Sequence, residues 1–528
     1  MTALSSIPKK KQSQHVEEEF GETVQVKQGQ RPNYTVQNPL ASISGFTNYN
    51  ATEMRVITEW KKILGENYRL HGFTGIETRP VEYADNLLKK GGMAKQIYGV
   101  SRLQDGSLTK LGIPFDRTLP LAIFIAQHET TITFPYVRFD IGYAFRGEHA
   151  SKGRYRAFIQ ADNDIIDRKL TDRSDAQCIV TMIKGIQLLG VKKCVLFLNH
   201  IEVAKAYIQA AGVSKENFEQ ALRVIDKLKP DNLEEVVKEL TETVPELNEE
   251  DAETLLNQMS YRGKITDFEF PEDMDQTAKK GFEHLKEICK QAELMGIAPG
   301  VIQFCPGLVR GLDYYTGVVF ETFIPGKEKY GSIASGGRYS NLVDGFSTKK
   351  TQLEGVGASI GLTRLFDVMK EEGAVDLKRQ TSAQVFVGYR TLGEGCYEKA
   401  IEVANHLQKL GIYVELYSSN KIQVGTQLEL CKNKGIPFAI MVMNKDELLF
   451  KDMTTSTIDQ LTKDDLKTKN KEQLKELVKK DQLAFKGLDD LILHVKGLKQ
   501  MGEFEVSNMA PEEKKEEKKE EKQIGKKK

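Results

Sequence analysis

Apolar residues recur at helical spacing near the start of the chain. Within 51–70 they fall three residues apart, at Met54, Ile57, Trp60 and Ile63. This period places them on one face of a helix, so we predict an α-helix over 51–70. The residues that follow, HGFTGIETRPVEY, predict a turn, a short strand and then a proline.

Five apolar stretches have the length and composition of buried strands. They are Pro120 to Ala126, Tyr136 to Phe145, Val195 to Leu198, Gly317 to Phe323 and Gly331 to Ala334. They predict a sheet that is built before residue 200 and resumed after residue 300. Between the two parts, 201–298 is rich in Glu, Lys and Leu with helical periodicity, which predicts a helical insertion.

The C-terminal part alternates regularly between strand and helix patterns. Strand AQVFVGYR, helix CYEKAIEVANHLQKLG, strand YVELYS, helix VGTQLELCKNKG and strand FAIMVMN follow one another from about 383 to 444. This βαβαβ order predicts a separate α/β domain. The two chain ends are polar, and the last residues run EEKKEEKKEEKQIGKKK, so we predict a flexible extension and a solvated tail.

These shifts in pattern set the predicted boundaries. They are a polar extension over 1–40, a first sheet segment over 41–200, an insertion over 201–298, a second sheet segment over 299–376, an α/β domain over 382–505 and a charged tail over 506–528.

Composition narrows the class of protein. A chain of 528 residues holds three or more domains at about 100–200 residues per domain. Its 40% hydrophobic and 28% charged residues fit a globular protein rather than a disordered one. With 75 basic and 75 acidic residues it is not a globally basic nucleic-acid binder, although a local basic face can still meet RNA.

The sequence also predicts the compartment. No stretch approaches the ~18 apolar residues that span a bilayer, and the start MTALSSIPKKKQSQHVEEEF has no apolar leader core. Six cysteines without a CxxC pair predict reduced thiols rather than disulfides or a zinc cluster. We therefore expect a cytoplasmic protein with no membrane segment.

Several common catalytic fingerprints do not occur in the sequence. GxxxxGK followed by Ser or Thr is missing, and the segment GVGASIG at 355–361 misses GxGxxG by one residue. HExxH and GxSxG are missing as well. Neither a P-loop, a dinucleotide site, a zinc-protease site nor a nucleophile elbow is predicted.

A dense arginine segment remains. FRGEHASKGRYRAFIQ, at 145–160, places Arg146, Lys152, Arg154 and Arg156 around Glu148. Two strands joined by a Gly-containing turn can aim several guanidiniums at one polyphosphate, because the planar fork makes bidentate contacts. Taken alone, the segment equally fits an exposed, salt-bridged hairpin.

Three further segments combine Gly, Tyr and Arg. They are LVRGLDYYTGVVFE at 308–321, GSIASGGRYSNLV at 331–343 and GVGASIGLTRLFDVM at 355–369. In the second, Gly336 and Gly337 allow backbone to approach a ligand without a Cβ in the way. In the third, a Gly-rich strand runs into a helix that carries Arg364. Each segment alone is as well explained by a turn or a packing junction.

Together these segments resemble the class II aminoacyl-tRNA synthetases. The arginine hairpin is similar to motif 2 of that class, the Gly-rich strand ending at Arg364 is similar to motif 3, and Pro80 suits motif 1. Within the class, LVRGLDYYTG and SIASGGRYSNL resemble the two signature segments of the histidyl-tRNA synthetase family. The resemblance covers about 45–500.

The resemblance implies an α+β fold: an antiparallel catalytic sheet flanked by helices, a helical insertion and a C-terminal α/β anticodon-binding domain. The segments over 41–200 and 299–376 would then form the catalytic domain. It also implies a histidine–tRNA ligase that uses L-histidine, ATP and Mg²⁺, binds histidine tRNA and acts as a homodimer.

Matching residue by residue, the resemblance implies two sets of contacts. For histidine they are Asp116, Arg117 and Thr118 near the α-amino group, Gln160, and Asp164, Tyr314 and Tyr315 around the imidazole. For ATP they are Arg146, Glu148, Arg154, Phe158 and Arg364. Arg310 and Arg146 would be the catalytic arginines, and no metal ligand is assigned.

Asp164 and Tyr315 make a chemically sensible pair for imidazole. Its neutral form has one N–H donor and one nitrogen acceptor, which a carboxylate and a phenol can read at once. Two positions depart from the family pattern. His149 stands where Arg is frequent, and Thr363 replaces the Glu that usually precedes the motif 3 arginine.

Three other functions fit parts of the sequence. One is the synthetase-like regulatory subunit of ATP phosphoribosyltransferase, whose members usually lack the anticodon domain and have eroded ATP motifs. Another is a class II synthetase for proline, threonine or glycine, against which LDYYTG argues. The third is an RNA-binding or scaffolding protein with an inactive site, which the presence of Arg146, Arg310 and Arg364 disfavours.

Overall fold

A computed structural model describes residues 40–88, 95–102, 110–229, 231–309, 315–340, 343, 345–346, 352–390, 393–419, 423–454 and 482–500. Arg310 and Tyr314, expected at the site, and the two chain ends lie outside these residues. Within them, no helix has the length and apolar character needed to cross a membrane.

The main sheet has eight strands in the order β1-β5-β6-β11-β10-β9-β7-β8. Their bounds are β1 Thr74–Gly75, β5 Tyr136–Phe145, β6 Ala157–Asp167, β7 Val195–His200, β8 Ile302–Phe304, β9 Val318–Phe323, β10 Ala334–Tyr339 and β11 Glu354–Gly361. Strands β5, β6, β11, β10, β9 and β7 pair antiparallel in turn, while β1 and β8 join the two edges in parallel. The predicted α+β fold, with an antiparallel catalytic sheet, is confirmed.

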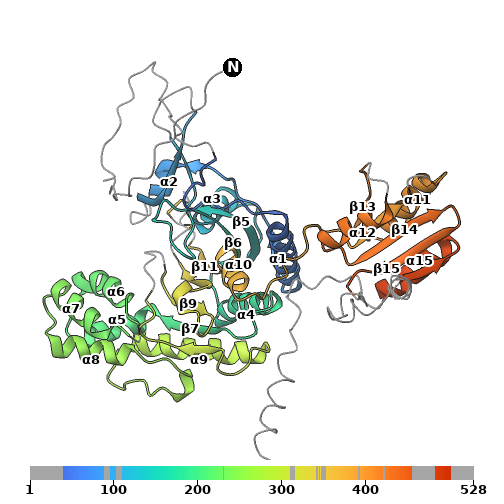
Figure 1. The fold of residues 1–528 in the computed structure, drawn as a ribbon. Helices are drawn as coiled ribbons and strands as arrows, with labels where there is room; N and C mark the ends of the chain where they lie inside the picture. Colours follow the sequence, from blue (N-terminus) through green and yellow to red (C-terminus); the bar gives the residue numbers. More distant parts are fainter. Residues whose placement is uncertain are drawn as a thin grey trace, which may run out of the picture.

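The two faces of this sheet differ in chemistry. Antiparallel partners point to the same face, so the register groups Ile159, Ile165, Val356 and Phe320 in the apolar core. Helices α1 (Ala51–Leu70) and α4 (Asp172–Leu188) pack on this face (Figure 1). The alternate positions carry charged groups and glycine, which makes the opposite face the candidate binding face.

Helix α1 begins and ends where the apolar pattern predicts. Asn50 caps its start, accepting a hydrogen bond from the Glu53 backbone N–H at 3.0 Å, while Glu53 accepts one from Asn50 in return. Trp60 and Leu64 are buried in the sheet core.

Two predicted strands are wrong in position or type. Residues 120–126 belong to helix α3 (Thr118–His128), whose start is capped by Asp116, which accepts a hydrogen bond from the Leu119 N–H at 2.9 Å. Both sides of this helix are buried, so its sequence is apolar throughout and lacks the periodicity that identifies a helix. The strand expected over 331–334 begins only at Ala334, because Gly331 has a positive φ of 73° and ends the turn before it.

A small three-stranded sheet, in the order β2-β4-β3, precedes α3. It contains β2 Glu82–Tyr83, β3 Tyr98–Val100 and β4 Leu111–Ile113, with helix α2 Ala84–Leu88 beside it. The main-sheet helix α10 Leu362–Glu371 follows β11 directly, as the Gly-rich segment predicts.

The insertion is helical, as predicted. It contains α5 Ile201–Ala210, α6 Phe218–Ile225, α7 Leu233–Thr243, α8 Glu249–Met259 and α9 Gln276–Leu294, with short 3₁₀ turns at Lys215–Asn217 and Ile265–Asp267. Helix α9 packs against α4 and α5, so the insertion is continuous with the sheet core (Figure 1).

The C-terminal unit has its own sheet and its own two hydrophobic clusters. Its order is β13-β12-β14-β15-β16, with bounds β12 Val385–Tyr389, β13 Val414–Leu416, β14 Phe438–Asn444, β15 Glu447–Asp452 and β16 Gln482–Phe485. Helices α11 Cys396–Lys409, α12 Val424–Asn433 and α15 Leu488–Gln500 complete it. The parallel pairing of β12 with β13 and β14 confirms the βαβαβ unit, to which β15, β16 and α15 are added.

Close packing explains one glycine of β10. A Cβ on Gly336 would stand 2.1 Å from the Gly357 carbonyl oxygen and 2.5 Å from the Phe320 ring. We expect Gly336→Ala to lower the free energy of unfolding by about 1–3 kcal/mol, since backbone must move to admit the methyl group.

The matched control is Gly65→Ala in α1, where the nearest atom to the new Cβ is 3.7 Å away. Removing a helical glycine there should be neutral or stabilising by up to about 1 kcal/mol. Chemical denaturation of both variants measures the difference, and equal stabilities would contradict this account of Gly336.

Candidate active site

Charged and polar side chains alternate along two neighbouring strands of the binding face. Arg138 and Asp140 lie on β5, and Gln160, Asp162 and Asp164 lie on β6. Cross-strand register pairs Arg138 with Asp164 and Asp140 with Asp162. A strip of alternating polar residues therefore crosses an otherwise buried sheet.

Beside this strip, two glycines on neighbouring strands leave the sheet surface without side chains. We call this surface the glycine floor. Gly357 of β11 is the cross-strand partner of Asp164, and Gly337 of β10 is the next partner along. A Cβ on Gly357 would meet Asp164 Oδ1 at 2.0 Å, and one on Gly337 would meet the Tyr315 ring at 2.7 Å. Asp164 thus lies over Gly357 and Tyr315 over Gly337, so the two side chains meet the glycine floor at neighbouring points.

Asp164 is ion-paired through one oxygen and accepts a hydrogen bond at the other. The Arg138 guanidinium lies 2.6 Å from Oδ2, and Tyr339 donates its O–H to Oδ1 at 2.8 Å. Burial raises the pKa of the Asp164 carboxyl, and the adjacent Arg138 cation acts in the opposite direction. Arg138 is fully buried, so this pair has no bulk water to screen it.

The residues expected near the α-amino group lie at the start of α3. Asp116 caps the helix, Thr118 is its first residue, and Arg117 extends over Gly142 of β5. Arg117 is ion-paired with Asp140 and donates to the Tyr143 carbonyl at 3.0 Å. Arg117 is therefore fixed by the protein itself, which favours a positioning role over direct contact with histidine.

The arginine hairpin is confirmed as β5, β6 and their connection. Arg146 leaves the end of β5, donates to the Phe115 carbonyl at 3.1 Å, and holds its guanidinium 5.1 Å from the centre of the Phe158 ring. Glu148 is partly buried in the connecting loop, and Arg154 is exposed. Gln160 donates to Ser359 Oγ at 2.8 Å, which links β6 to β11 at the edge of the floor.

Arg364 joins the hairpin loop to the turn before β10. It donates from Nε to the Gly153 carbonyl at 2.8 Å and from Nη1 to the Ser332 carbonyl at 2.5 Å. The structure thus brings the motif 2 loop and the motif 3 arginine together, as the resemblance implies.

The two departures from the family pattern have different surroundings. Thr363 is buried and accepts a hydrogen bond from the Ile159 N–H at 2.9 Å, so its side chain belongs to the packing between α10 and β6. His149 is exposed in the hairpin loop.

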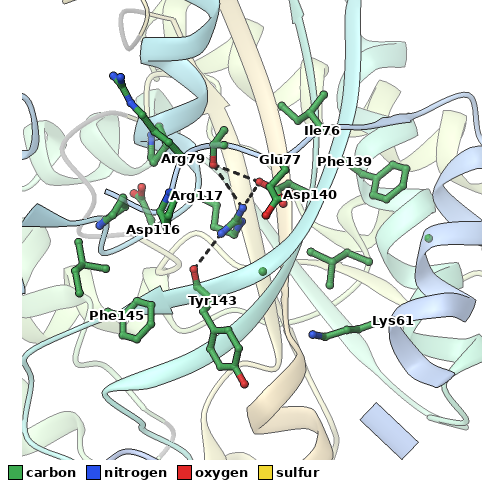
Figure 2. Close-up of a pocket in the computed structure, with 18 of the residues that line it drawn as sticks. Lys61, Ile76, Glu77, Arg79, Asp116, Arg117, Phe139, Asp140, Tyr143 and Phe145 are labelled. Atoms are coloured by element: carbon green, nitrogen blue, oxygen red, sulfur yellow. Dashed lines mark hydrogen bonds and ion pairs between the residues drawn. The ribbon is translucent and has the colours of Figure 1, made fainter. Parts of the chain in front are cut away.

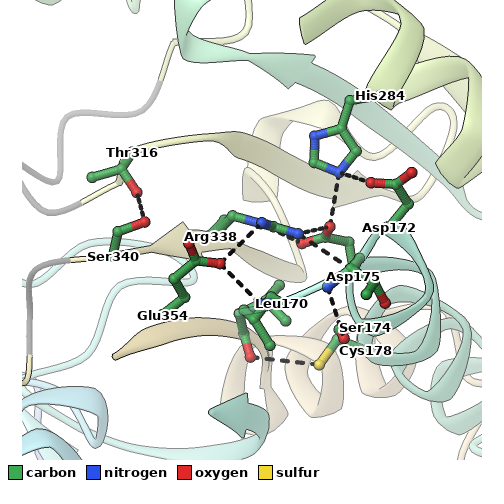
Figure 3. Close-up of polar contacts among 12 residues, drawn as sticks. Leu170, Asp172, Ser174, Asp175, Cys178, His284, Thr316, Arg338, Ser340 and Glu354 are labelled. Atoms are coloured by element: carbon green, nitrogen blue, oxygen red, sulfur yellow. Dashed lines mark hydrogen bonds and ion pairs between the residues drawn. The ribbon is translucent and has the colours of Figure 1, made fainter. Parts of the chain in front are cut away.

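Arg338 has a structural role that the sequence did not reveal. Its guanidinium spans both oxygens of Asp175 on α4, at 2.5 and 3.2 Å, and His284 of α9 approaches the same carboxylate at 2.9 Å (Figure 3). The cluster ties β10 to α4 and to the insertion. In the described residues Asp172, Asp175 and His284 have ligand atoms close enough for a metal, but the Arg338 cation already occupies Asp175.

Sequence reasoning also missed Arg138, Asp140 and Asp162. A signal was available, because YVRFDIGYAF and QADND place charged residues two apart within strands. That spacing puts them on one face of the sheet, where charges in an apolar strand mark a binding surface.

A pocket of about 710 Å³ lies at the β1 and β5 edge of the sheet (Figure 2). Of the residues expected at the site, only Asp116 and Arg117 line it. Lys61, Arg79 and Tyr143 are among the other residues of its lining. It therefore lies beside the glycine floor and not on it.

Comparison with known proteins identifies the family. The family model for histidyl-tRNA synthetase matches residues 45–365, and that for an anticodon-binding domain matches residues 384–481. This chain belongs to the histidyl-tRNA synthetase family.

Curated relatives agree with the family. A histidine–tRNA ligase of Wolinella succinogenes is 33% identical over 415 residues, covering 77% of this chain and 91% of the relative. One from Helicobacter pylori is 32% identical over 398 residues, covering 74% and 86%. These names support the ligase over the regulatory-subunit alternative.

Solved structures share the fold. The histidyl-tRNA synthetase of a Nostoc species has a TM-score of 0.72 at 26% identity, covering 87% of this chain and all of that chain. A Bacillus halodurans protein described as an ATP phosphoribosyltransferase regulatory subunit/histidyl-tRNA synthetase has a TM-score of 0.61 at 18% identity, covering 77% and 98%. At that identity the second likeness shows the fold alone.

Proposed function

We propose that this chain carries out the histidine–tRNA ligase reaction of its family on the glycine-floored face of the main sheet. It activates L-histidine with ATP to histidyl-adenylate and then transfers histidine to the 3′ end of histidine tRNA. The observation that carries the assignment of the site is the placement of Asp164 over Gly357 and of Tyr315 over Gly337. A carboxylate and a phenol at this floor can hydrogen-bond the two nitrogens of an imidazole.

Activation needs positioning and charge neutralisation more than proton transfer. The histidine carboxylate is already ionised at pH 7, so its attack on the α-phosphorus of ATP needs no general base. Arg146 would neutralise the α-phosphate together with Arg310, which lies outside the described residues. Phe158 would stack on adenine, while Glu148, Arg154 and Arg364 hold the adenine and γ-phosphate ends.

The magnesium that accompanies ATP also has a suitable partner. Glu321 of β9 lies on the binding face and accepts a hydrogen bond from Ser332 at 3.0 Å, while the Ser332 carbonyl binds Arg364. Carboxylate oxygen is a ligand that Mg²⁺ prefers, so Glu321 would hold the ion beside the phosphates. Bound there, Mg²⁺ would screen the charge of the β- and γ-phosphates.

Amino-acid specificity tests this assignment. We expect ATP–pyrophosphate exchange with histidine alone among the twenty amino acids, because a pocket that hydrogen-bonds both imidazole nitrogens rejects apolar side chains by roughly 10⁴. Exchange with proline or threonine at a comparable rate would point to another class II synthetase. No exchange with any amino acid would favour the regulatory subunit.

A homodimer is also proposed, with the β1 and β5 edge as the interface. Tyr143, which lines the pocket there, is 46% exposed. Pro80, the motif 1 proline, lines the same pocket. Light scattering should give twice the monomer mass, and Tyr143→Asp should raise the monomer fraction; a monomeric wild-type protein would contradict the proposal.

Transfer RNA and the compartment complete the proposal. The C-terminal unit, matched by an anticodon-binding family, would bind histidine tRNA. A cytoplasmic location is supported by the six cysteines, which are all free and mostly buried, as in proteins of a reducing compartment.

A further inference from the structure

Asp162 is a buried carboxyl in the middle of the binding face to which the family resemblance assigns no role. It lies on β6 between Gln160 and Asp164, and only 3% of it is exposed. Its Oδ1 accepts no hydrogen bond from the residues that the structure describes. Buried polar atoms are nearly always hydrogen-bonded, so an unmatched oxygen on a binding face points to a polar ligand.

Charge pairing around Asp162 shows which kind of ligand fits. The ionisable groups that face it or its neighbours are Arg138 and Asp140 of β5, Asp164 of β6, Asp116 and Arg117 before α3, Tyr68 of α1 and Tyr339 of β10. Arg138 is paired with Asp164, and Arg117 with Asp140. Both guanidiniums are therefore matched already, and a charge on Asp162 would be in excess.

The protonation state of Asp162 follows from this excess of negative charge. Burial raises the pKa of the Asp162 carboxyl to about 7, an effect that Arg138 opposes and Asp164 reinforces. Near neutral pH the carboxyl is thus divided between its neutral and charged forms, and an added cation would hold it in the charged form.

We propose that Asp162 joins the contacts expected from Asp116 and Thr118 as a second counter-charge for the α-ammonium group of the amino-acid substrate, and that it releases a proton when this group binds. The inference rests on the proposed function, because it takes histidine as the ligand. The neutral carboxylic acid becomes a carboxylate paired with the ammonium, and its proton goes to solvent. Gln160 is two residues away on the same strand face, at the end of the site opposite to the imidazole contacts.

The first experiment compares the wild type with Asp162→Asn, which has the same shape and no charge. At pH 8 we expect the dissociation constant for histidine to rise about 10-fold or more in the variant, the scale for losing a charged partner. Below pH 7 the wild type must lose a proton from Asp162 to bind histidine. The ratio of its histidine affinity to that of the variant should therefore shrink about tenfold per pH unit. Isothermal titration between pH 6 and 8 measures both.

The second measurement counts protons and identifies the responsible group of the ligand. Titration at pH 6.5 in two buffers of different ionisation enthalpy should show more protons released by the wild type than by Asp162→Asn. We expect this difference with histidine and with histidinol, which keep the ammonium, and none with imidazolepropionic acid, which lacks it. Protons taken up or released by the imidazole of the ligand are the same for both proteins, so they cancel in the difference between wild type and variant.

Two outcomes would overturn the inference and leave the proposed function intact. One is an equal proton count in wild type and variant, and the other is the same difference with imidazolepropionic acid. Failure of the wild type to bind histidine at all would overturn both.

If Asp162→Asn does not fold, Ser359→Ala provides the same test. The Ser359 hydroxyl bonds to the Asp162 carboxyl and lowers its pKa, so removing it should move the midpoint of the pH dependence upward. An unchanged midpoint would count against Asp162 as the titrating group.

Discussion

Arg146→Ala should lower the rate of histidyl-adenylate formation by about 10²–10³-fold, the scale for losing one preorganised donor at a centre where charge develops. Arg146 is held for this purpose by two contacts, its hydrogen bond to the Phe115 carbonyl and its place 5.1 Å from the centre of the Phe158 ring. Neither contact uses its terminal nitrogens, so the guanidinium can still bind phosphate bidentately. Single-turnover measurement of adenylate formation isolates this step.

The matched control is Arg168→Ala, at the other end of the same hairpin. Arg168 is exposed and follows β6 directly, so its loss should leave the rate and the unfolding temperature unchanged. If Arg146→Ala kept a normal rate while its unfolding temperature fell by several degrees, Arg146 would be a structural residue. A loss shared equally by both variants would indicate a non-specific charge effect.

The sequence was informative wherever a residue pattern had a local cause. Helix 51–70 followed from apolar spacing, and the hairpin followed from strands that alternate around a glycine turn. Helix α3 shows the limit of that reasoning. A helix buried on both sides leaves no polar face, and its apolar run of 120–126 is then indistinguishable from a strand.

Long-range contacts lie beyond that limit altogether. Asp175 and Arg338 are 163 residues apart, and nothing in either local sequence marks them as partners.

The glycines at 336–337 illustrate a mixed case. Sequence reasoning attributed both to the approach of a ligand, whereas Gly337 lies beneath Tyr315 on the binding face and Gly336 faces the core. Only the strand register separates the two roles.

Removing the C-terminal unit should separate the two steps of the reaction. We expect a chain that ends after residue 378 to keep adenylate formation within a few-fold, because the main sheet and the insertion share one hydrophobic cluster that contains none of the C-terminal residues. The cut retains Asp376, whose carbonyl accepts a hydrogen bond from Arg55 of α1 at 2.5 Å. The sheet domain therefore keeps its own contacts.

Charging of tRNA by the same truncated chain should fall by about 10²-fold or more, since phosphate contacts supply much of the affinity for nucleic acid. The matched control removes only 506–528, whose acidic and basic residues alternate and attract little phosphate, and should charge normally. Loss of both steps in a folded truncated chain would instead indicate that the C-terminal unit stabilises the catalytic site, because adenylate formation needs no tRNA.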